Sequence, residues 1–309
     1  MRGPRVVLGL AAAFLLGPTA AATAADDVRA RGAHEEFTCL GEPATIVGSP
    51  GDDNIVGTAH RDVIMARAGD DTIEGRGGDD LICGGTGADT VLGGNGDDWI
   101  DAGPGPFPDF IRGGPGNDTI RARGAATLVI GGPGDDNIWA KKDAARVFGN
   151  EGDDTIRTGQ GDASFGRGGP GDDLVRGAGT GAILHGGNGN DRVVGGPSSQ
   201  ELFGGPGHDT VEGRSLGDRL FGGPGRDRLE GGRQSQELWG DEGDDILLGL
   251  GGPDDLDGGP GDDDLNGGSG DDTLFGRQGN DILDGSFGKG DRCVGGPGIN
   301  TIRRCEILT

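Results

Sequence analysis

Aspartate recurs at a fixed place in a nine-residue unit that fills most of this 309-residue chain. The unit reads Gly-Gly-X-Gly-X-Asp-X-(Leu/Ile/Val)-X, and three copies follow without a gap: GGPGDDDLN at 258–266, GGSGDDTLF at 267–275 and GRQGNDILD at 276–284. Glycines at positions 1, 2 and 4 permit positive φ angles that aim backbone carbonyls at one point. The carboxylate at position 6 adds hard oxygen ligands, so each turn offers the donor set of Ca²⁺. The position-5 residue is expected to offer only its carbonyl.

The bulk composition fits a cation-binding repeat better than the alternatives. With 72 Gly, 16 Pro, 4% aromatic residues and a net charge of −25, the chain would read as disordered if it had no period. The strict period instead predicts turns separated by short strands. The acidity argues against nucleic acid and anionic membranes as partners, because their phosphates need basic surfaces.

The nonapeptide resembles the calcium-binding repeat of RTX, or haemolysin-type, proteins over residues 48–303. The Cys-containing ends, FTCLGEPATIVG at 37–48 and DRCVGGPGINTIRRCE at 291–306, resemble those of small secreted proteins of actinobacterial type. The resemblance implies an all-β fold, a right-handed parallel β-roll (a calcium-binding β-solenoid) with two nonapeptides per 18-residue coil. Each coil is expected to contain two turns and two three-residue strands, with an ion between successive turns of one column.

When the nonapeptides are assigned alternately to two columns of turns, the first column is unbroken. Its complete units begin at Gly75, Gly93, Gly113, Gly131, Gly149, Gly168, Gly186, Gly204, Gly222, Gly240, Gly258 and Gly276. The candidate metal ligands in this column are the position-6 aspartates Asp80, Asp98, Asp118, Asp136, Asp154, Asp173, Asp191, Asp209, Asp227, Asp245, Asp263 and Asp281.

The second column keeps its metal-binding pattern only near its two ends. Its candidate metal ligands are Asp53, Asp71, Asp89, Asp254 and Asp272. Between them, position 6 is held by Thr127, Ala145, Ala182, Gln200, Asp218 or Gln236, while the inward aliphatic residue persists. Extra residues within 102–112, 158–167 and 285–294 also fall in this column. The strands are therefore expected to continue where the ions do not.

The gaps between complete turns predict about 14 Ca²⁺, which would bring about +28 in charge. Removal of Arg2 and Arg5 with a signal peptide takes the chain from −25 to −27, so the ions would nearly neutralise it. Each coil buries only two aliphatic side chains, worth about 3–6 kcal/mol. Ordering its backbone costs on the order of 1–2 kcal/mol per residue. We therefore expect the chelated chain to be largely unfolded and calcium to drive folding.

The ends of the chain predict export. Residues 1–25 read as a cleaved signal peptide with Arg2 and Arg5, the apolar core 6–16 and small residues at 22–24, too short to span a bilayer. We divide the remainder into an N-terminal cap (26–47), the roll (48–303) and the tail of a C-terminal cap (304–309). A secreted, extracellular protein with no transmembrane segment is expected.

Four cysteines fit an oxidising destination. Cys39 and Cys83 bracket the first coils, and Cys293 and Cys305 lie close together near the C-terminus, so we favour these two pairs as disulfides. Four cysteines allow three pairings, and zinc is the competing interpretation, although no CxxC spacing is present.

No motif predicts an enzyme. The sequence has four histidines, and none pairs with a nucleophile in a recognisable motif: His34, His60, His185 and His208. A β-helix lyase or epimerase would need a larger coil and a basic or Tyr-bearing groove, and the chain has no Tyr. The alternative function is a calcium-stiffened surface adhesin or matrix component that docks a cell-surface protein or glycan through the metal-poor edge. Its support is an outward apolar stripe at position 9 of the second-column units, formed by Ile130, Phe148, Phe203, Phe221 and Trp239. The competing interpretation is that position 9 simply tolerates aromatic residues at the corner of the coil.

Overall fold

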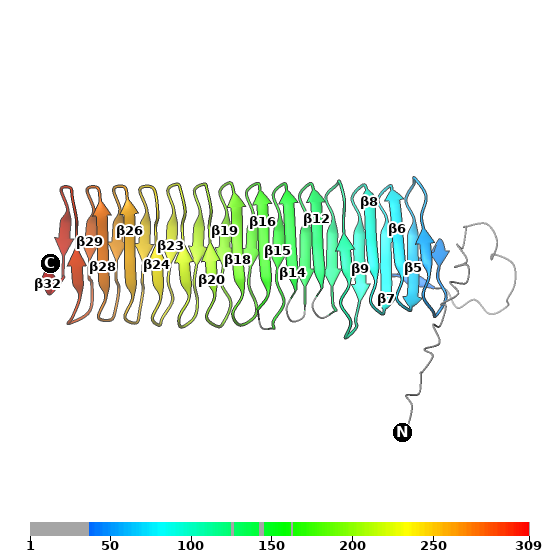
Figure 1. Cartoon of the computed structure of the whole chain (residues 1–309), viewed down its shortest axis with the longest axis horizontal. Coiled ribbons are helices and arrows are strands. Elements are labelled where there is room, and N and C mark those ends of the chain that lie inside the picture. Colours follow the sequence, from blue (N-terminus) through cyan, green and yellow to red (C-terminus); the bar gives the residue numbers. More distant parts are fainter. Residues whose placement is uncertain (1–36, 125–126, 142–144, 162, 309) are drawn as a thin grey trace, which may run out of the picture.

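The computed structural model describes residues 37–308 except 125–126, 142–144 and 162. The described residues form a long parallel β-solenoid whose coils follow one another from the N-terminal to the C-terminal end (Figure 1). No helix of a length and apolarity that could cross a membrane occurs among them. The predicted signal peptide lies outside the described residues.

Two parallel sheets of 15 strands face each other, one built from even-numbered and one from odd-numbered strands. The even sheet contains β4 (Asn54–Val56), β6 (Thr72–Gly77), β8 (Thr90–Asn95), β10 (Phe110–Arg112), β12 (Leu128–Pro133), β14 (Arg146–Glu151), β16 (Phe165–Pro170), β18 (Ile183–Asn188), β20 (Glu201–Phe203), β22 (Arg219–Phe221), β24 (Glu237–Trp239), β26 (Asp255–Pro260), β28 (Thr273–Gln278), β30 (Arg292–Val294) and β32 (Ile307–Leu308). The odd sheet contains β3 (Ile46–Val47), β5 (Val63–Ala68), β7 (Leu81–Thr86), β9 (Trp99–Gly103), β11 (Thr119–Ala122), β13 (Asn137–Ala140), β15 (Thr155–Arg157), β17 (Leu174–Arg176), β19 (Arg192–Val194), β21 (Thr210–Glu212), β23 (Arg228–Glu230), β25 (Ile246–Leu248), β27 (Asp264–Asn266), β29 (Ile282–Asp284) and β31 (Thr301–Arg303).

The coil length is confirmed by the strand register. Ile64 pairs with Ile82, and Ile82 with Ile100, 18 residues apart each time. The separation grows to 20 at Ile100↔Ile120 and to 19 at Ile156↔Val175. It is also 19 at Leu274↔Cys293. The three insertions are thus accommodated in second-column turns without breaking either sheet.

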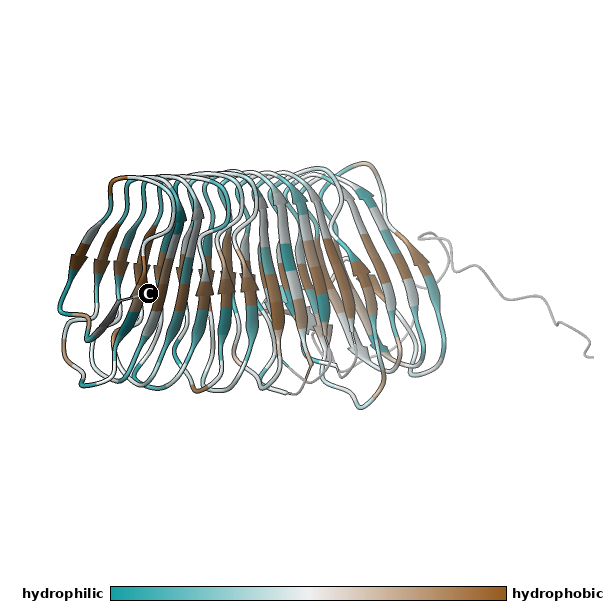
Figure 2. Ribbon diagram, turned by 60° about the vertical axis from the view of Figure 1, so that its left-hand side comes forward, coloured by the Kyte–Doolittle hydropathy of each residue, from teal (hydrophilic) through white to brown (hydrophobic). Residues whose placement is uncertain are grey.

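One inward side chain from nearly every strand builds the core, and in β16 the inward position is Gly166. These aliphatic residues form a single continuous buried cluster from Ile55 to Cys293. Figure 2 shows the apolar residues gathered in the strands, with paler or hydrophilic turns between them. The core between the two sheets is therefore thin, with a single layer of side chains from each sheet. The single aliphatic residue per nonapeptide predicts this.

Strand length differs from the expectation of three residues. Many strands, including β6, contain six residues because the second and third residues of the following turn also pair with the next coil. Arg76 pairs with Gly94 and Gly77 with Asn95, for example. The turns are therefore part of the hydrogen-bonded ladder and stack in register, coil upon coil.

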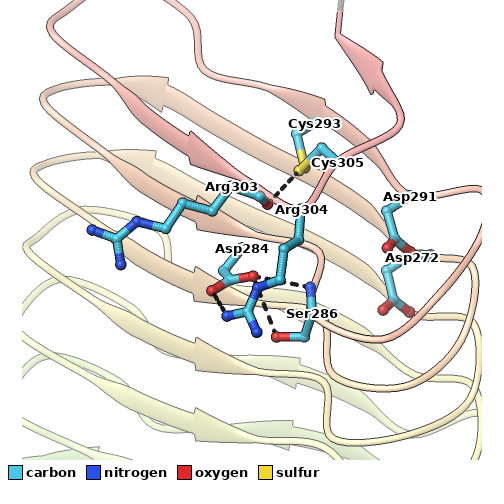
Figure 3. Close-up of a disulfide and its surroundings, with 8 residues drawn as sticks. All are labelled: Asp272, Asp284, Ser286, Asp291, Cys293, Arg303, Arg304 and Cys305. Atoms are coloured by element: carbon cyan, nitrogen blue, oxygen red, sulfur yellow. Dashed lines mark hydrogen bonds and ion pairs between the residues drawn. A yellow bond between two sulfur atoms is a disulfide. The ribbon is translucent and has the colours of Figure 1, made fainter.

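Both ends are closed by a disulfide, and both predicted pairs are confirmed. Cys39, in the antiparallel hairpin of β1 (Thr38–Cys39) and β2 (Glu42–Pro43), is bonded to Cys83 of β7. Cys293 of β30 is bonded to Cys305 (Figure 3). The strand ladder also runs past residue 303, since β32 pairs with β30.

Candidate metal centre

The first-column aspartates form a ladder of hydrogen bonds between coils. The N–H of Asp80 donates to Asp98 Oδ1 at 2.9 Å, and the N–H of Asp118 donates to Asp136 Oδ1 at 2.8 Å. The same bond recurs in each coil as far as Asp263 and Asp281, at 3.2 Å, and Asn300 Oδ1 accepts from Asp281 at the end. One carboxylate oxygen of each aspartate is therefore fixed by the backbone of the preceding coil.

The second carboxylate oxygen of these aspartates, and of four aspartates in the second column, is buried and has no hydrogen-bond partner. The Oδ2 atoms in this state belong to Asp71, Asp80, Asp89, Asp98, Asp118, Asp136, Asp154, Asp173, Asp191, Asp209, Asp227, Asp245, Asp254, Asp263, Asp272 and Asp281. All are among the sequence-predicted ligands, and no other carboxylate of the described residues shares the property. A buried, unpaired carboxylate is costly unless it is neutralised or coordinates a metal.

Each orphaned oxygen lies beside a position-1 glycine, except that of Asp71, whose unit has Ala66 at position 1. A Cβ added to Gly75 would lie 2.4 Å from Asp80 Oδ2 and 2.3 Å from the carbonyl oxygen of Gly93 in the next coil. At Gly240 the corresponding distances, to Asp245 Oδ2 and the Gly258 carbonyl, are both 2.4 Å. Carboxylate and carbonyl oxygens thus converge on a point that any side chain would fill, and this donor set suits a hard cation.

The glycines serve two different purposes. Position 1 does not adopt a positive φ, contrary to our expectation, and where it is glycine the oxygens leave little room for a Cβ; the unit of Asp71 has Ala66 there instead. Position 4 does require the conformation, with φ of +126° at Gly96 and +154° at Gly225, outside the range that side chains tolerate. Position 2 has a positive φ that Arg76 and Asn150 also adopt.

Burial shapes the acid–base behaviour of the ladder. It raises the pKa of Asp118, Asp154 and Asp209 to about 8, from an ordinary value of 3.8, with neighbouring aspartates adding to the effect. At the N-terminal end of the column, burial raises the pKa of Asp80 only to about 6. A cation beside Oδ2 would oppose this shift by favouring the ionised form.

Side chains alone do not surround a cation anywhere in the described residues, since no group of three or more His, Cys, Asp or Glu side chains converges on one point. The sites therefore depend on backbone carbonyls, which hard cations accept and soft or redox metals do not favour.

Position 5 does more than the sequence predicts. Its side chain accepts the N–H of the equivalent residue one coil later, as in Asn190 N–H to Asp172 Oδ1 (2.7 Å) and His208 N–H to Asn190 Oδ1 (3.0 Å). His208 Nδ1 then accepts from the N–H of Arg226 at 2.9 Å. Asp, Asn and His share an acceptor two bonds beyond Cβ, which explains why they alternate at this exposed position.

Two turns in the middle of the second column, those of Asp218 and Gln236, are satisfied without ions, whereas Thr127 Oγ1, Ser164 Oγ and Gln200 Oε1 are buried without a hydrogen-bond partner among the described residues. Asp218 Oδ1 accepts from Gln200 N–H, and its Oδ2 accepts from the N–H groups of Arg214 and Ser215, each at 2.8 Å. Gln236 Oε1 accepts from Gly232 N–H at 2.9 Å, while its Nε2 donates to the Ser215 carbonyl at 2.8 Å. At the N-terminal end, Asp53 Oδ2 accepts from the N–H of Ser49 at 2.6 Å, unlike its orphaned counterparts.

Three aspartates of the ladder were missed by the sequence pattern. Asp62 N–H donates to Asp80 Oδ1, Asp109 Oδ1 accepts from Asp89, and Asp291 Oδ1 accepts from Asp272 (Figure 3). Their units lack the position-4 glycine or contain an insertion. The signal that could have found them is the aspartate placed two residues before an inward residue, as in Asp62-Val63-Ile64.

The outward aromatic stripe exists on the even sheet, but its expected place is wrong. Position 9 directly precedes the first-column turn, as Phe203 precedes Gly204, so the stripe borders the Asp ladder and not the metal-poor edge. It also includes His185, while β16 has Arg167 at position 9 and its Phe165, at position 7, lies 5.4 Å from the Phe148 ring and 5.6 Å from the His185 ring. From His185 through Phe203 and Phe221 to Trp239 the rings stack face to face at 4.4–4.7 Å, so they cover one another's faces.

Comparison with known proteins identifies the repeat. The family model described as the RTX calcium-binding nonapeptide repeat (four copies) matches overlapping segments that together cover residues 47–163 and 167–302. No curated protein matches the chain. A solved structure, a hyperactive, Ca²⁺-dependent, β-helical antifreeze protein from an Antarctic bacterium, is 18% identical, with 83% of this chain and 88% of that chain covered at a TM-score of 0.47.

Proposed function

Since the chain belongs to the RTX calcium-binding nonapeptide-repeat family, we propose that its Asp ladders are calcium sites that fold the roll when they fill. The observation that carries the proposal is the row of buried Oδ2 atoms without partners. The ligands are the twelve first-column aspartates together with Asp53, Asp71, Asp89, Asp254 and Asp272, completed by carbonyls of the position-1 glycines. Calcium supplies the positive charge that lets these carboxylates remain ionised inside the turns.

The proposed stoichiometry is about 14 Ca²⁺ per chain. Asp62, Asp109 and Asp291 extend the two columns at points where the nonapeptide is imperfect, so turns that contain them are additional candidates. The hydrogen bonds to both carboxylate oxygens of Asp218 and to both ends of the Gln236 amide support metal-free turns in the middle of the second column.

We further propose that the protein is secreted and acts without catalysis. Two disulfides favour an oxidising compartment. Among the described histidines, His185 lies in the aromatic stack and His208 in the position-5 ladder, while His60 is exposed in a turn. The surface-adhesin alternative loses the stripe as its argument, because rings that cover one another offer few free faces to a partner or glycan.

A calcium titration tests the calcium proposal. Circular dichroism should change from a largely unordered to a β spectrum as Ca²⁺ replaces excess chelator, and equilibrium dialysis should count about 14 ions. Mg²⁺ is the matched control, because it demands a stricter octahedral geometry and should not replace Ca²⁺ at equal concentration. A full β spectrum in excess chelator, or equal folding by Mg²⁺, would contradict the proposal.

A further inference from the structure

One face of this acidic protein is basic. Along the outward side of β11, β13, β15 and β17, the residues in register are Arg121, Trp139, Arg157 and Arg176. The second outward row of the same strands, from Thr119 to Leu174, is uncharged. Lys141 follows Trp139 closely in the chain. Four successive coils therefore present no acidic side chain on this surface, although acids outnumber bases 52 to 27 in the sequence.

These cations have no carboxylate partner among the described residues. No ion pair joins Arg121, Lys141, Arg157 or Arg176 to an acid, and Arg176 Nε is buried without a hydrogen-bond partner. The nearest acid in the same row, Asp101, is paired with Arg123. The cationic charge of this face is therefore available to an external anion.

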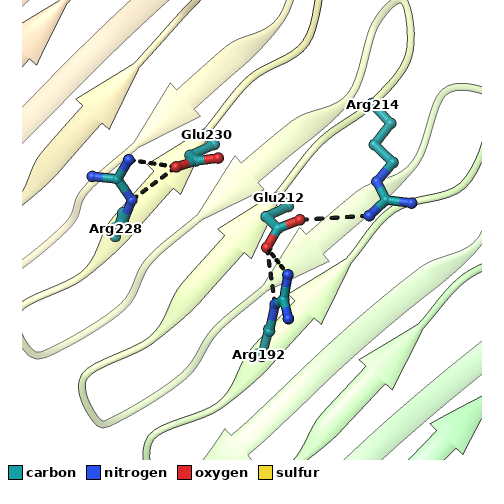
Figure 4. A network of polar contacts seen from close by, with 5 residues as sticks. All are labelled: Arg192, Glu212, Arg214, Arg228 and Glu230. Atoms are coloured by element: carbon teal, nitrogen blue, oxygen red, sulfur yellow. Dashed lines mark hydrogen bonds and ion pairs between the residues drawn. The ribbon is translucent and has the colours of Figure 1, made fainter.

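The next coils of the same sheet show the contrast (Figure 4). There Arg192 donates to Glu212, which also contacts Arg214 at 3.6 Å, and Arg228 is paired with Glu230. The arginines of β19 and β23 are thus paired with glutamates of β21 and β23, whereas those of β11, β15 and β17 have no such partner among the described residues. The difference is a local property of the basic face and does not follow from the repeat itself.

Exposed tryptophans accompany the unpaired arginines. Trp139 is 45% and Trp99 38% exposed, and the Arg121 guanidinium lies 5.1 Å from the centre of the Trp99 ring. A hollow of about 390 Å³ is lined by Trp99, Arg121, Trp139 and Arg157, and one of about 360 Å³ continues from Trp139 to Arg176. Among the residues that the structure describes, no other aromatic ring stacks on Trp139, unlike in the aromatic stripe.

We propose that this Trp–Arg face binds an acidic polysaccharide whose chain runs along the solenoid axis. Guanidinium groups pair with carboxylate or sulfate in two parallel hydrogen bonds, and an exposed indole packs against the apolar side of a sugar ring. Arg121 and Arg157 are two strands apart, or about 9–10 Å at the usual strand spacing, which is close to the length of a disaccharide. An extended polymer can therefore meet both arginines with Trp139 between them.

The charge balance favours a polysaccharide over nucleic acid. DNA carries one charge per about 1.7 Å of helix axis, and the Asp-rich turns beside this narrow face would repel charges that extend past it. A uronic-acid polymer has about one charge per one or two sugars and can align them with the arginines alone. The proposal depends on the folded, calcium-loaded roll but not on any particular ion site.

The test is a binding titration of the full, calcium-loaded chain with a hyaluronan decasaccharide at buffered Ca²⁺. Arg121→Gln with Arg157→Gln should weaken binding at least tenfold, and Trp139→Ala several-fold. The matched control, Arg192→Gln with Arg228→Gln, removes the same charge from paired positions on the same sheet and should change affinity less than twofold. Circular dichroism of each variant separates a failure to fold with calcium from a loss of binding.

Neutral maltodecaose and a short DNA duplex complete the design. Hyaluronan should bind, the neutral sugar should not, and DNA should bind at least tenfold more weakly. The proposal is overturned if hyaluronan does not bind the folded chain, if the double variant binds as the natural chain does, or if either comparison ligand binds as tightly. If Arg121→Gln disturbs folding, Arg157→Gln alone is decisive, because that side chain is exposed.

Discussion

Replacing Asp136 by asparagine should remove one calcium site while leaving the hydrogen-bond ladder intact. The Asp118 N–H donates to Asp136 Oδ1 at 2.8 Å, and an asparagine retains that acceptor. What the substitution removes is the negative charge on Oδ2, which is buried and unpaired. The change therefore separates the role in metal binding from the role in coil stacking.

The size of the effect follows from mass action. An ion that binds only the folded form stabilises it by RT ln(1 + [Ca²⁺]/Kd). Extracellular calcium modules have Kd values of about 10⁻⁴–10⁻³ M, so about 10 mM Ca²⁺ makes each site worth about 1.4–2.7 kcal/mol. Because coils contact only their neighbours, the loss should be of this order and should not abolish folding.

Urea unfolding at 10 mM Ca²⁺, with equilibrium dialysis of the folded protein, measures both quantities. Asp136→Asn should lower the unfolding free energy by about 1–3 kcal/mol and reduce the ion count by about one. Asp135→Asn is the matched control: it removes the same charge one residue earlier, at a position where Asn117 and Asn190 already occur. The reasoning is refuted if Asp136→Asn leaves the ion count unchanged, or if Asp135→Asn lowers it equally.

Three further outcomes are expected. In excess chelator, acidification from pH 9 to 5 should increase the β signal in circular dichroism. Burial raises the folded-state pKa of Asp118 and Asp154 to about 8 against an ordinary 3.8, so protonation favours the folded form and this stabilisation is lost as the pH rises through 8. An unchanged β signal on acidification would contradict this prediction. Gln236→Ala should cost about 1–3 kcal/mol in urea unfolding, because it leaves the Ser215 carbonyl and Gly232 N–H without partners, while the ion count in dialysis stays unchanged; a lost ion would place calcium in that turn. Joint replacement of Cys39 and Cys83 by serine should destabilise the N-terminal coils by about 4 kcal/mol on the chain-entropy estimate for a loop of this length, and hydrogen exchange should locate the loss there and not in the C-terminal coils.

The sequence predicted the periodic part of this structure well, because backbone geometry enforces the period. An inward side chain every nine residues fixes the register, and a slip would turn Leu202 or Leu220 outward. Position 4 must be glycine to reach φ values such as +154° at Gly225, so the motif itself marks the turns. Both disulfides follow from the same register, since it places their cysteines in adjacent coils or caps.

What the sequence left open depends on contacts between coils. Asp109 follows an insertion, and only the packed structure shows that the extra residues bulge outward and leave its carboxylate in the ladder. His208 is an exposed surface residue, and its hydrogen bond with the N–H of Arg226 could not be read from the sequence because it joins residues 18 apart. The Trp–Arg face was not anticipated either, because unpaired arginines become visible only when the positions of all neighbouring acids are known.

In the Gln236 turn of the second column, a neutral amide takes the place of an ion. Beside Gly231, Gln236 Oε1 lies 2.9 Å from the position of an added Cβ, much as Asp245 Oδ2 lies 2.4 Å from that of Gly240. The attached Nε2 then donates to the Ser215 carbonyl, so one side chain provides both the acceptor and the positive end of a dipole. No buried charge remains to be neutralised, and this turn can close without calcium. The calcium requirement for folding should therefore reside mainly in the first column, whose carboxylates have no such substitute.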